Sequence, residues 1–479
     1  MKKLESYFQL GQNGTTFSRE LIAGATTFFA MVYIIFVNPN ILSQTGIPKD
    51  AVFVATILAT VIGTLVMALF ANVPYALAPG MGLNAFFTYT VCFGLGFDWR
   101  EALALVFICG ILNVVITVTK VRKAIIRAIP KGLQNAIGGG IGLFIAYIGL
   151  KDAGMLTFTI DPGHWVEGFG VIYGDASAIP AISNFASWAP VLAIIGLLLT
   201  VILLVCKVKG AILIGIVATA LLGIPMGLTV LPDFSSANYG AQVYGDMFRN
   251  FGSTIGQCFV GFKGLFSSWS RLPLVFLAIF AFSLTDTFDT IGTFIGTGRR
   301  TGIFSDADLA AVENGTGFKT KMERALFADS IATSMGAILG TSNTTTYIES
   351  GAGIEAGGRT GLTSVFTAAL FLLCIVFYPL VAVVPASATA PALIIVGIMM
   401  AGAFKEVEWS DFAEAVPAFL AAAMMAFAYS ISIGIAFGFI FYVIVKVCQG
   451  KAKEIHPILW VSASLFLVYF IAMAINALA

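Results

Sequence analysis

The sequence predicts an all-α polytopic membrane protein of about 14 transmembrane segments, arranged as two inverted repeats of seven segments. Of the 479 residues, 58% are hydrophobic and 11% are charged, whereas soluble domains carry about 25% charged residues. Apolar stretches of about 20 residues, the length of a helix that crosses a bilayer, recur along the whole chain. Two stretches are interrupted at matching places in the two halves of the chain, which is typical of inverted repeats.

The apolar stretches predict the order of the segments. The candidates are residues 21–43, 52–71, 79–96, 101–119, 132–150, 188–206, 210–231, 272–297, 325–341, 343–355, 361–384, 387–404, 412–428 and 430–449. A further apolar stretch covers residues 457–478. We expect residues 1–231 to form the first repeat, residues 272–449 the second, and residues 450–479 an apolar C-terminal tail.

The short connections carry cations on one side only, and this asymmetry predicts the orientation. Cations follow segments four, six, eight and fourteen: Lys120, Arg122, Lys123, Arg127 and Lys131; Lys207 and Lys209; Arg299, Arg300, Lys319, Lys321 and Arg324; Lys446, Lys451 and Lys453. We expect this side, with the N-terminus, to be cytoplasmic in a plasma (cytoplasmic or inner) membrane. The long loops 151–187 and 232–271 then face outward.

Charge and cysteine spacing argue against several function classes. The formal net charge of +1 argues against a nucleic-acid partner. The six cysteines lie in or beside apolar segments without a C-x-x-C spacing, which indicates small apolar fillers rather than disulfides or metal ligands. An enzyme is the least favoured class, because the sequence has no His/Cys metal cluster, serine elbow or phosphate loop. We expect no cofactor and no metal.

The third and tenth segments do not fit plain transmembrane helices. The third begins VPYALAPGMGLNAFF, where Pro79, Gly80 and Gly82 interrupt regular helix. The tenth reads TSNTTTYIESGAGIEAGGRTG, with polar residues at 342–346. Each pattern predicts an extended stretch followed by a half-length helix. Irregular backbone at this depth is tolerated only where protein or a water-filled cavity satisfies its polar groups, so the interruptions predict a cavity.

Segment eight carries SLTDTFDTIGTFIGTG, with Asp286 and Asp289 one helical turn apart on one face. A carboxylate at the bilayer centre costs about 2.5 to 3.5 kcal/mol on insertion scales, so two of them indicate a function. Two carboxylates this close in a poorly hydrated site do not both ionise easily, and we expect one of them, Asp286, to take up a proton. Asn84 and Glu349 begin the half-helices, whose first N–H groups lack partners within the helix.

Together these groups predict a pocket for a small, planar, hydrogen-bonding solute. We expect aromatic residues close in sequence to supply flat apolar walls: Phe86, Phe87, Phe288 and Tyr347.

Structural roles are the alternative for each of these residues. Asp286 and Asp289 could accept hydrogen bonds from threonines or from the amides of the broken helices, and Asn84 and Glu349 could simply cap the helices that follow them. Asp329 lies near the start of segment nine, where a carboxylate complements the helix dipole.

Four motifs occur in order along the chain: GATTFFAMVYIIFVNPNIL, FANVPYALAPGMGLNAFF, DTFDTIGT and RALFADSIATSMGAILGTSNTTTYIESGAGIEAGGRTGLT. They resemble the AzgA-like purine permeases, a branch of the nucleobase-ascorbate transporter group, and the resemblance covers essentially the whole chain. It implies a core domain from residues 17–120 and 272–384 and a gate domain from residues 131–231 and 387–449. It also implies proton-coupled, elevator-like uptake of purine bases such as adenine, guanine and hypoxanthine, and a homodimer formed through the gate domain.

The resemblance also implies roles for single residues. We expect the substrate-binding residues to be Asn84, Asp289, Glu349, Gly82, Phe86 and Ser350. We expect the proton-coupling residues to be Asp286, Asp289, Glu349 and Asp329.

Two other kinds of transport protein stay open on the residues alone. A sodium-coupled nucleobase carrier would use Asp286 with threonine hydroxyls and broken-helix carbonyls as oxygen ligands, and a small-solute channel would use the same carboxylates as a selectivity ring. The expected partners are a purine nucleobase, a proton, the lipid bilayer and a second copy of the chain.

Overall fold

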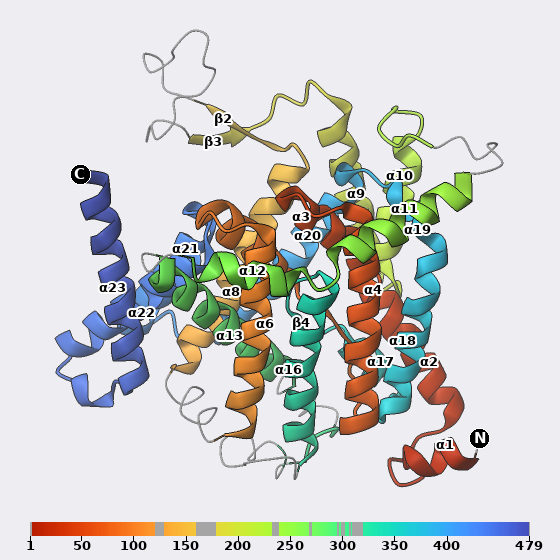
Figure 1. Ribbon diagram of the computed structural model, residues 1–479, viewed down its shortest axis with the longest axis horizontal. Coiled ribbons are helices and arrows are strands. Elements are labelled where there is room, and N and C mark those ends of the chain that lie inside the picture. Colours follow the sequence, from red (N-terminus) through yellow and green to blue (C-terminus); the bar gives the residue numbers. More distant parts are fainter. Residues whose placement is uncertain are drawn as a thin grey trace.

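Helices make up most of the molecule (Figure 1). The computed structural model describes residues 2–119, 129–159, 179–231, 239–267, 271–294, 297, 302–305, 308 and 320–478. Some residues named above lie outside the described part: Lys120, Arg122, Lys123, Arg127, Arg299, Arg300, Lys319 and the side chain of Phe288. Among the described residues, nine helices are long and apolar enough to cross a membrane.

The first seven predicted segments are present in the expected order. They are α2 (Phe17–Met31) with α3 (Ile34–Leu42); α4 (Lys49–Val66); β1 (Leu77–Pro79) with α5 (Met81–Ala85) and the π-helix η3 (Phe86–Gly94); α6 (Trp99–Val118); α8 (Lys131–Asp152); α9 (Trp188–Val205); and α10 (Ala211–Gly223).

The second seven segments follow the same order. They are α13 (Leu272–Thr293); α16 (Lys321–Leu339); β4 (Thr344–Thr346) with α17 (Ser350–Glu355); α18 (Gly361–Leu373) with α19 (Tyr378–Ala382); α20 (Ala386–Ala401); α21 (Phe412–Phe427); and α22 (Ile431–Cys448). The predicted helical class and both interruptions are therefore confirmed. The apolar tail forms α23 (Pro457–Leu478), which packs against α22.

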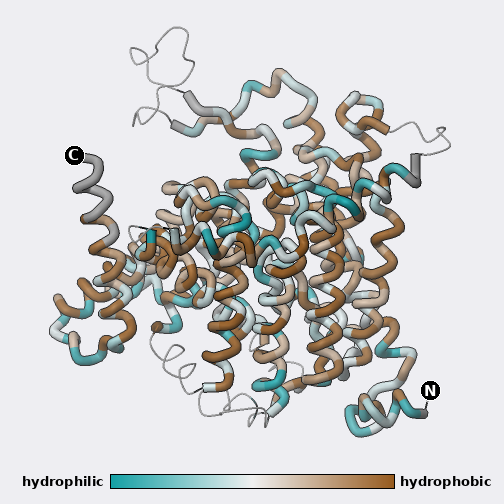
Figure 2. Tube along the Cα trace, in the orientation of Figure 1, coloured by the Kyte–Doolittle hydropathy of each residue, from teal (hydrophilic) through white to brown (hydrophobic). Residues whose placement is uncertain are grey.

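Hydrophobic residues run along the transmembrane helices, and hydrophilic residues gather outside them. Figure 2 shows hydrophobic residues along α4 and α6, and hydrophilic residues in α1 (Lys2–Tyr7) and in the connection between α22 and α23. This pattern is the one expected of helices that face lipid, because no water is available there to solvate polar side chains.

Helix packing divides the bundle into two groups. In the first helix group, α16 packs against α4 and α6, and α18 packs against α2 and α4. This group also includes α3, which packs against α4, and η3 with α5, because η3 packs against α6. In the second helix group, α8 packs against α20 and α21, α21 against α22, and α9 against α10 and α20.

The fifth segments of the two repeats, α8 and α20, cross at a pair of glycines. A Cβ on Gly142 would lie 2.6 Å from the carbonyl oxygen of Gly397, and a Cβ on Gly397 would lie 2.5 Å from the carbonyl oxygen of Gly142. Because any side chain at either position would clash with backbone, only glycine allows this approach. Such a reciprocal contact between equivalent segments fits two inverted repeats.

A buried carboxylate from α2 holds the beginning of α18. Glu20 is fully buried, and its Oε2 accepts hydrogen bonds from the hydroxyls of Thr360 and Thr363, each at 2.7 Å. Its Oε1 accepts from the backbone N–H of Arg359 at 2.9 Å, and the Arg359 guanidinium donates to the carbonyl oxygen of Ile354 at 2.7 Å. Glu20 thus satisfies N–H groups that have no partner within α18. Glu20 and Arg359 join α2, α17 and α18.

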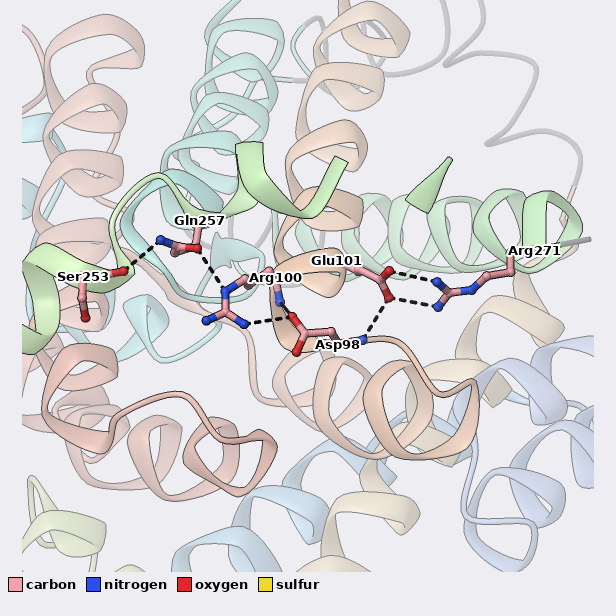
Figure 3. Close-up of polar contacts among 6 residues, drawn as sticks. All are labelled: Asp98, Arg100, Glu101, Ser253, Gln257 and Arg271. Carbon is pink, nitrogen blue, oxygen red and sulfur yellow. Dashed lines mark hydrogen bonds and ion pairs between the residues drawn. The ribbon is translucent and has the colours of Figure 1, made fainter. Parts of the chain in front are cut away.

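The loop 232–271, expected to be a plain connection, contains two helices, α11 (Tyr239–Thr254) and α12 (Gln257–Leu265). Figure 3 shows how side chains tie this region to the first turn of α6. Arg271 donates two bonds of 2.9 Å to the carboxylate of Glu101, which also accepts from the backbone N–H of Asp98 at 3.0 Å. Arg100 donates to the amide oxygen of Gln257 at 3.0 Å. These polar contacts anchor α12 beside α6.

The other long loop, 151–187, holds the antiparallel strands β2 (Leu156–Thr159) and β3 (Ile179–Ile182) where it is described.

The contact between α12 and α6 generates a stability prediction. A Cβ on Gly261 of α12 would lie 1.9 Å from the carbonyl oxygen of Arg100. We therefore expect Gly261→Ala to lower the free energy of unfolding by the about 1 to 3 kcal/mol that is typical of overpacking. The measurement is the thermal unfolding temperature of the detergent-solubilised protein, which should fall. Gly245→Ala on α11 is the matched control, because nothing lies within 4 Å of the added Cβ. Equal unfolding temperatures for the two variants would contradict the packing of α12 on α6.

Candidate functional site

A two-stranded antiparallel ribbon between the helices positions the candidate site. β1 pairs with β4, with Ala78 opposite Thr345, and the Gly80 N–H extends the pairing by a 2.9 Å bond to the carbonyl oxygen of Asn343. Extended backbone in a membrane needs internal hydrogen-bond partners, and each strand supplies those of the other. Since the strands are antiparallel, the half-helices α5 and α17 begin at opposite ends of the ribbon.

Asp286 on α13 lies at the centre of a buried hydrogen-bond cluster. Its Oδ2 accepts from the side-chain amide of Asn113 on α6 (3.0 Å), the hydroxyl of Thr333 on α16 (3.1 Å) and the side-chain amide of Asn343 before β4 (3.3 Å). Within the described chain, Asp286 forms no ion pair with a lysine or arginine. The carboxylate therefore joins three helices and the ribbon through neutral donors.

Asp329 on α16 is a second buried carboxylate and holds the end of β4. Its Oδ1 accepts from the backbone N–H of Thr346 at 2.8 Å and from the hydroxyl of the same residue at 2.7 Å. Asp329 thus fixes the last residue of the strand from which the chain turns into α17.

Asp289 and Glu349, in contrast, are partly exposed and lie beside two tyrosines. The hydroxyl of Tyr33 donates to Glu349 Oε1 at 2.5 Å, and the hydroxyl of Tyr347 donates to the carbonyl oxygen of Pro79 at 2.7 Å. Asp289 forms no hydrogen bond or ion pair in the described part of the chain. The charges of Asp289 and Glu349 act on each other and on the Tyr33 hydroxyl. We call Tyr33, Asp289, Tyr347 and Glu349 the tyrosine–carboxylate site.

One side chain next to this site is exposed. Ile348, between Tyr347 and Glu349, is 54% exposed, although its neighbours along β4 are buried. An acceptor pair without cations, next to an aromatic hydroxyl and an exposed apolar side chain, can bind a small molecule that has N–H or O–H donors.

The remaining predicted site residues are fully buried between the elements that carry the site. Asn84 accepts a hydrogen bond from the hydroxyl of Ser342, which links α5 to the residues just before β4. The Oγ of Ser350 accepts from the Ala76 N–H at 3.0 Å, and Phe86 packs edge-on against Phe282 with 4.6 Å between ring centroids.

Gly82 allows close approach between the helix groups. A Cβ at this position would lie 2.6 Å from the Cγ2 of Ile141 on α8. The structure therefore leaves Asp289 and Glu349 partly exposed and near each other. The other predicted residues are buried: Asn84, Ser350, Phe86 and Gly82.

A cavity of about 430 Å³ lies between the two helix groups, where α3, α8 and α20 meet. Asn40, Lys151 and Thr389 contribute polar groups to its lining. The ammonium of Lys151 donates to the hydroxyl of Tyr429 at 3.1 Å and lies 5.2 Å from the ring centroid of Tyr89 on η3. Lys151 thus bridges η3 and the turn between α21 and α22, which belong to different helix groups.

Sequence reasoning missed several residues that build these sites. Tyr33 lies in an apolar run with no local pattern that marks it, and Asn113 and Thr333 are single polar residues on otherwise apolar helices. A signal was available for Asn113, because an amide in a membrane helix needs a partner and the nearby carboxylates supply one. Among the described residues, no group of three or more His, Cys, Asp or Glu side chains gathers as a metal site would require.

Residues 18–437 match the family model Xan_ur_permease, described as a permease family. The chain is 40% identical over 477 residues to the guanine/hypoxanthine permease PbuG of Bacillus subtilis, with 98% of this chain and 99% of the relative covered. It is 39% identical over 466 residues to the adenine permease AdeP of Escherichia coli, with 97% and 95% covered.

Among solved structures, the fold is similar to the transmembrane domain of a cyanobacterium bicarbonate transporter, BicA. The TM-score is 0.51 at 15% sequence identity, and the match covers 91% of this chain and 97% of that chain. At this identity the likeness concerns the fold alone.

The contacts of Asp286 generate a second stability prediction. Thr333→Val removes one donor from a buried carboxylate, and a hydrogen bond to a charged group contributes about 1.5 to 3 kcal/mol. Thr219→Val on α10 is the matched control, because that buried hydroxyl bonds only to the Gly215 carbonyl oxygen of its own helix, at 2.6 Å. We expect Thr333→Val to lower the thermal unfolding temperature clearly more than Thr219→Val. The opposite ranking would show that Asp286 does not hold the four elements together.

Proposed function

Because this chain belongs to the permease family, we propose that it imports purine nucleobases such as adenine, guanine and hypoxanthine by proton symport. The names of its relatives, adenine permease and guanine/hypoxanthine permease, support the substrate class. The chain is a multi-pass membrane protein. We further propose that it lies in the plasma membrane with a cytoplasmic N-terminus, as the cation asymmetry predicts. The homodimer implied by the family resemblance stays a prediction.

The tyrosine–carboxylate site is the observation that carries this proposal. A purine base is flat and has N–H donors along its edge, and Asp289 and Glu349 are two partly exposed acceptors without cationic partners. Hydrogen bonds from N–H donors to carboxylates are charge-assisted and about twice as strong as neutral ones. Asp289 and Glu349 accept from the purine in this proposal, and Tyr33 holds Glu349 in place between transport cycles.

The buried residues behind the site support it in this proposal. Asn84, Gly82, Phe86 and Ser350 join the half-helices to the ribbon or let the helix groups approach each other. Direct contact between any of them and the purine stays a prediction.

We propose an elevator-like movement of a core domain (17–120 and 272–384) past a gate domain (131–231 and 387–449). The division of the bundle into two helix groups supports this boundary. Gly82 against Ile141, and Lys151 between Tyr89 and Tyr429, are contacts that such a movement would exchange for others.

Proton coupling is assigned to the four carboxylates near the ribbon: Asp286, Asp289, Glu349 and Asp329. They have no lysine, arginine or histidine as an ion-pair partner among the described residues. Because an uncompensated buried charge is costly, protons are the natural partners of these groups.

The role of Glu349 generates a binding prediction. Glu349→Gln replaces a charge-assisted hydrogen bond by a neutral one, so we expect purine binding to weaken by about 1 to 2 kcal/mol, and Glu349→Ala to weaken it more. Purine dissociation constants measured on the purified protein test this. Glu355→Gln, at the exposed end of the same short helix, is the matched control. Unchanged affinity in both Glu349 variants would leave Glu349 as a structural residue.

The role of Asp286 generates a transport prediction. The asparagine of Asp286→Asn mimics a permanently protonated carboxyl, so we expect purine binding to survive while accumulation against a gradient and its pH dependence are lost. Uptake into proteoliposomes at several pH values, with a proton gradient or a sodium gradient, measures both. Asp246→Asn on α11 is an exposed control. If Asp286→Asn keeps the wild-type pH dependence of uptake, another group carries the coupled proton. If a sodium gradient alone drives uptake, sodium rather than a proton is the coupling ion.

A further inference from the structure

The cavity of about 430 Å³ between α3, α8 and α20 is separate from the tyrosine–carboxylate site, because none of the four residues of that site lines it. We propose that this cavity is an outer docking site, in which a purine base binds from outside before it reaches the tyrosine–carboxylate site. This inference rests on the proposed function, because it concerns an earlier position of the same substrate.

The mouth of the cavity lies at the outer end of the bundle. Gln44 follows α3, Lys151 lies in the last turn of α8, and Ala386 is the first residue of α20. All three residues are exposed. Lys131 begins α8 at the opposite end, on the side that is cytoplasmic in the proposed orientation. The mouth therefore faces outward.

Away from its mouth the cavity is apolar. Its lining there consists of buried residues, Val37 and Ile41 on α3 and Ala390 and Leu393 on α20. Apolar walls with a few placed polar groups are typical of sites for small molecules, whose volumes commonly run from about 300 to 1,000 Å³. A flat molecule such as a nucleobase suits a cavity of this size and lining.

The polar groups of the lining include acceptors and donors that have capacity left. The Asn40 amide donates to the Thr389 hydroxyl at 3.1 Å, but its oxygen accepts no hydrogen bond among the described residues. Asp152 forms no hydrogen bond or ion pair in the described part of the chain. The Lys151 ammonium has three N–H donors, one of which bonds to the Tyr429 hydroxyl. A purine carries both donors and acceptors on its edges, so it can use groups of both kinds.

One face of α3 joins the cavity to the tyrosine–carboxylate site. Tyr33, whose hydroxyl donates to Glu349, immediately precedes α3, and the Val37 N–H donates to the Tyr33 carbonyl oxygen at 3.2 Å. The lining residues of α3 and of the turn after it follow Tyr33 at the spacing of one helix face: Val37, Asn40, Ile41 and Gln44. The cavity therefore begins one helical turn from the residue that holds Glu349.

The walls of the cavity belong to the two helix groups that are proposed to move past each other. α3 belongs to the first group, and α8 and α20 belong to the second. The hydrogen bond between Asn40 and Thr389 joins the groups at this point. A purine in the cavity can replace this bond by hydrogen bonds to itself, which loosens the outer contact between the groups. Docking thus precedes the opening of a path to Tyr33.

Thiol labelling measures whether purine occupies the cavity. Ala386→Cys places a thiol at the mouth, in a background in which the exposed Cys206 and Cys448 are replaced by serine. Cells that produce this variant are treated from outside with a membrane-impermeant maleimide at increasing concentrations of adenine, guanine or hypoxanthine. At about ten times the dissociation constant about one cavity in eleven stays empty, so labelling should slow about 10-fold. Ile182→Cys, at a 74% exposed position of β3, is the control and should react equally with and without purine.

Further variants in the Ala386→Cys background separate the cavity from the tyrosine–carboxylate site. Glu349→Ala should impair uptake but leave unchanged the purine concentration that halves the labelling rate. Asp152→Asn replaces a charged acceptor by a neutral one and should raise this concentration by roughly 3-fold or more. Asp246→Asn on α11, an exposed carboxylate outside the cavity, is the matched control and should not raise it. Labelling without purine verifies that each variant reaches the cell surface.

Other results overturn the inference. Purine uptake without any slowing of labelling at Ala386→Cys would show that the cavity binds no purine, and would leave the proposed function standing. Protection that disappears in Glu349→Ala would come from purine at the tyrosine–carboxylate site instead. An unchanged half-protecting concentration in Asp152→Asn would remove the assigned acceptor and with it the site. No purine uptake in the wild type, in contrast, would overturn the proposed function itself.

Discussion

The pairing of β1 with β4 is the constraint on which the rest of the structure depends. A chain that crosses a membrane has no water to satisfy its backbone, so only helices and closed barrels normally span one. Here two extended stretches from different halves of the chain satisfy each other, with Ala78 opposite Thr345. Because neither strand is possible without the other, the two repeats must fold together, and the half-helices α5 and α17 receive fixed starting points.

The same constraint explains why the polar side chains gather around β4. Asp286 and Asp329 reach the ribbon from α13 and α16, and their partners are amides and hydroxyls rather than cations. A buried ion pair would lock the charges of both partners, whereas neutral donors leave a carboxylate able to gain or lose a proton. Glu20 shows a different arrangement, in which the carboxylate accepts hydrogen bonds from backbone N–H groups at the start of α18.

The sequence predicted the fold well because each feature had a local signal. Segment length and glycine or proline interruptions gave the order of the helices and the two breaks. The cost of carboxylates in a membrane singled out Asp286 and Asp289, and the position at the start of a half-helix singled out Glu349. Tyr33 was missed because it is far away in sequence and its apolar surroundings carry no pattern. Asn84 is fully buried, and its partner Ser342 depends on a contact between the repeats. The helix α11 was missed because it is too polar for a membrane span, and α12 because its nine residues are too few to cross one.

Two partly exposed carboxylates beside two buried ones offer a reason why purine and proton would move together. Asp289 and Asp286 lie one turn apart on α13, and the charge of Asp286 acts on Asp289. A proton on Asp286 removes this repulsion and leaves Asp289 free to be an ionised acceptor for a purine N–H. By linkage, a purine that stabilises the charge on Asp289 makes the proton on Asp286 harder to lose by the same free energy. The coupling of the proposed symport therefore requires no contact between the purine and the proton, only one helical turn between two carboxylates.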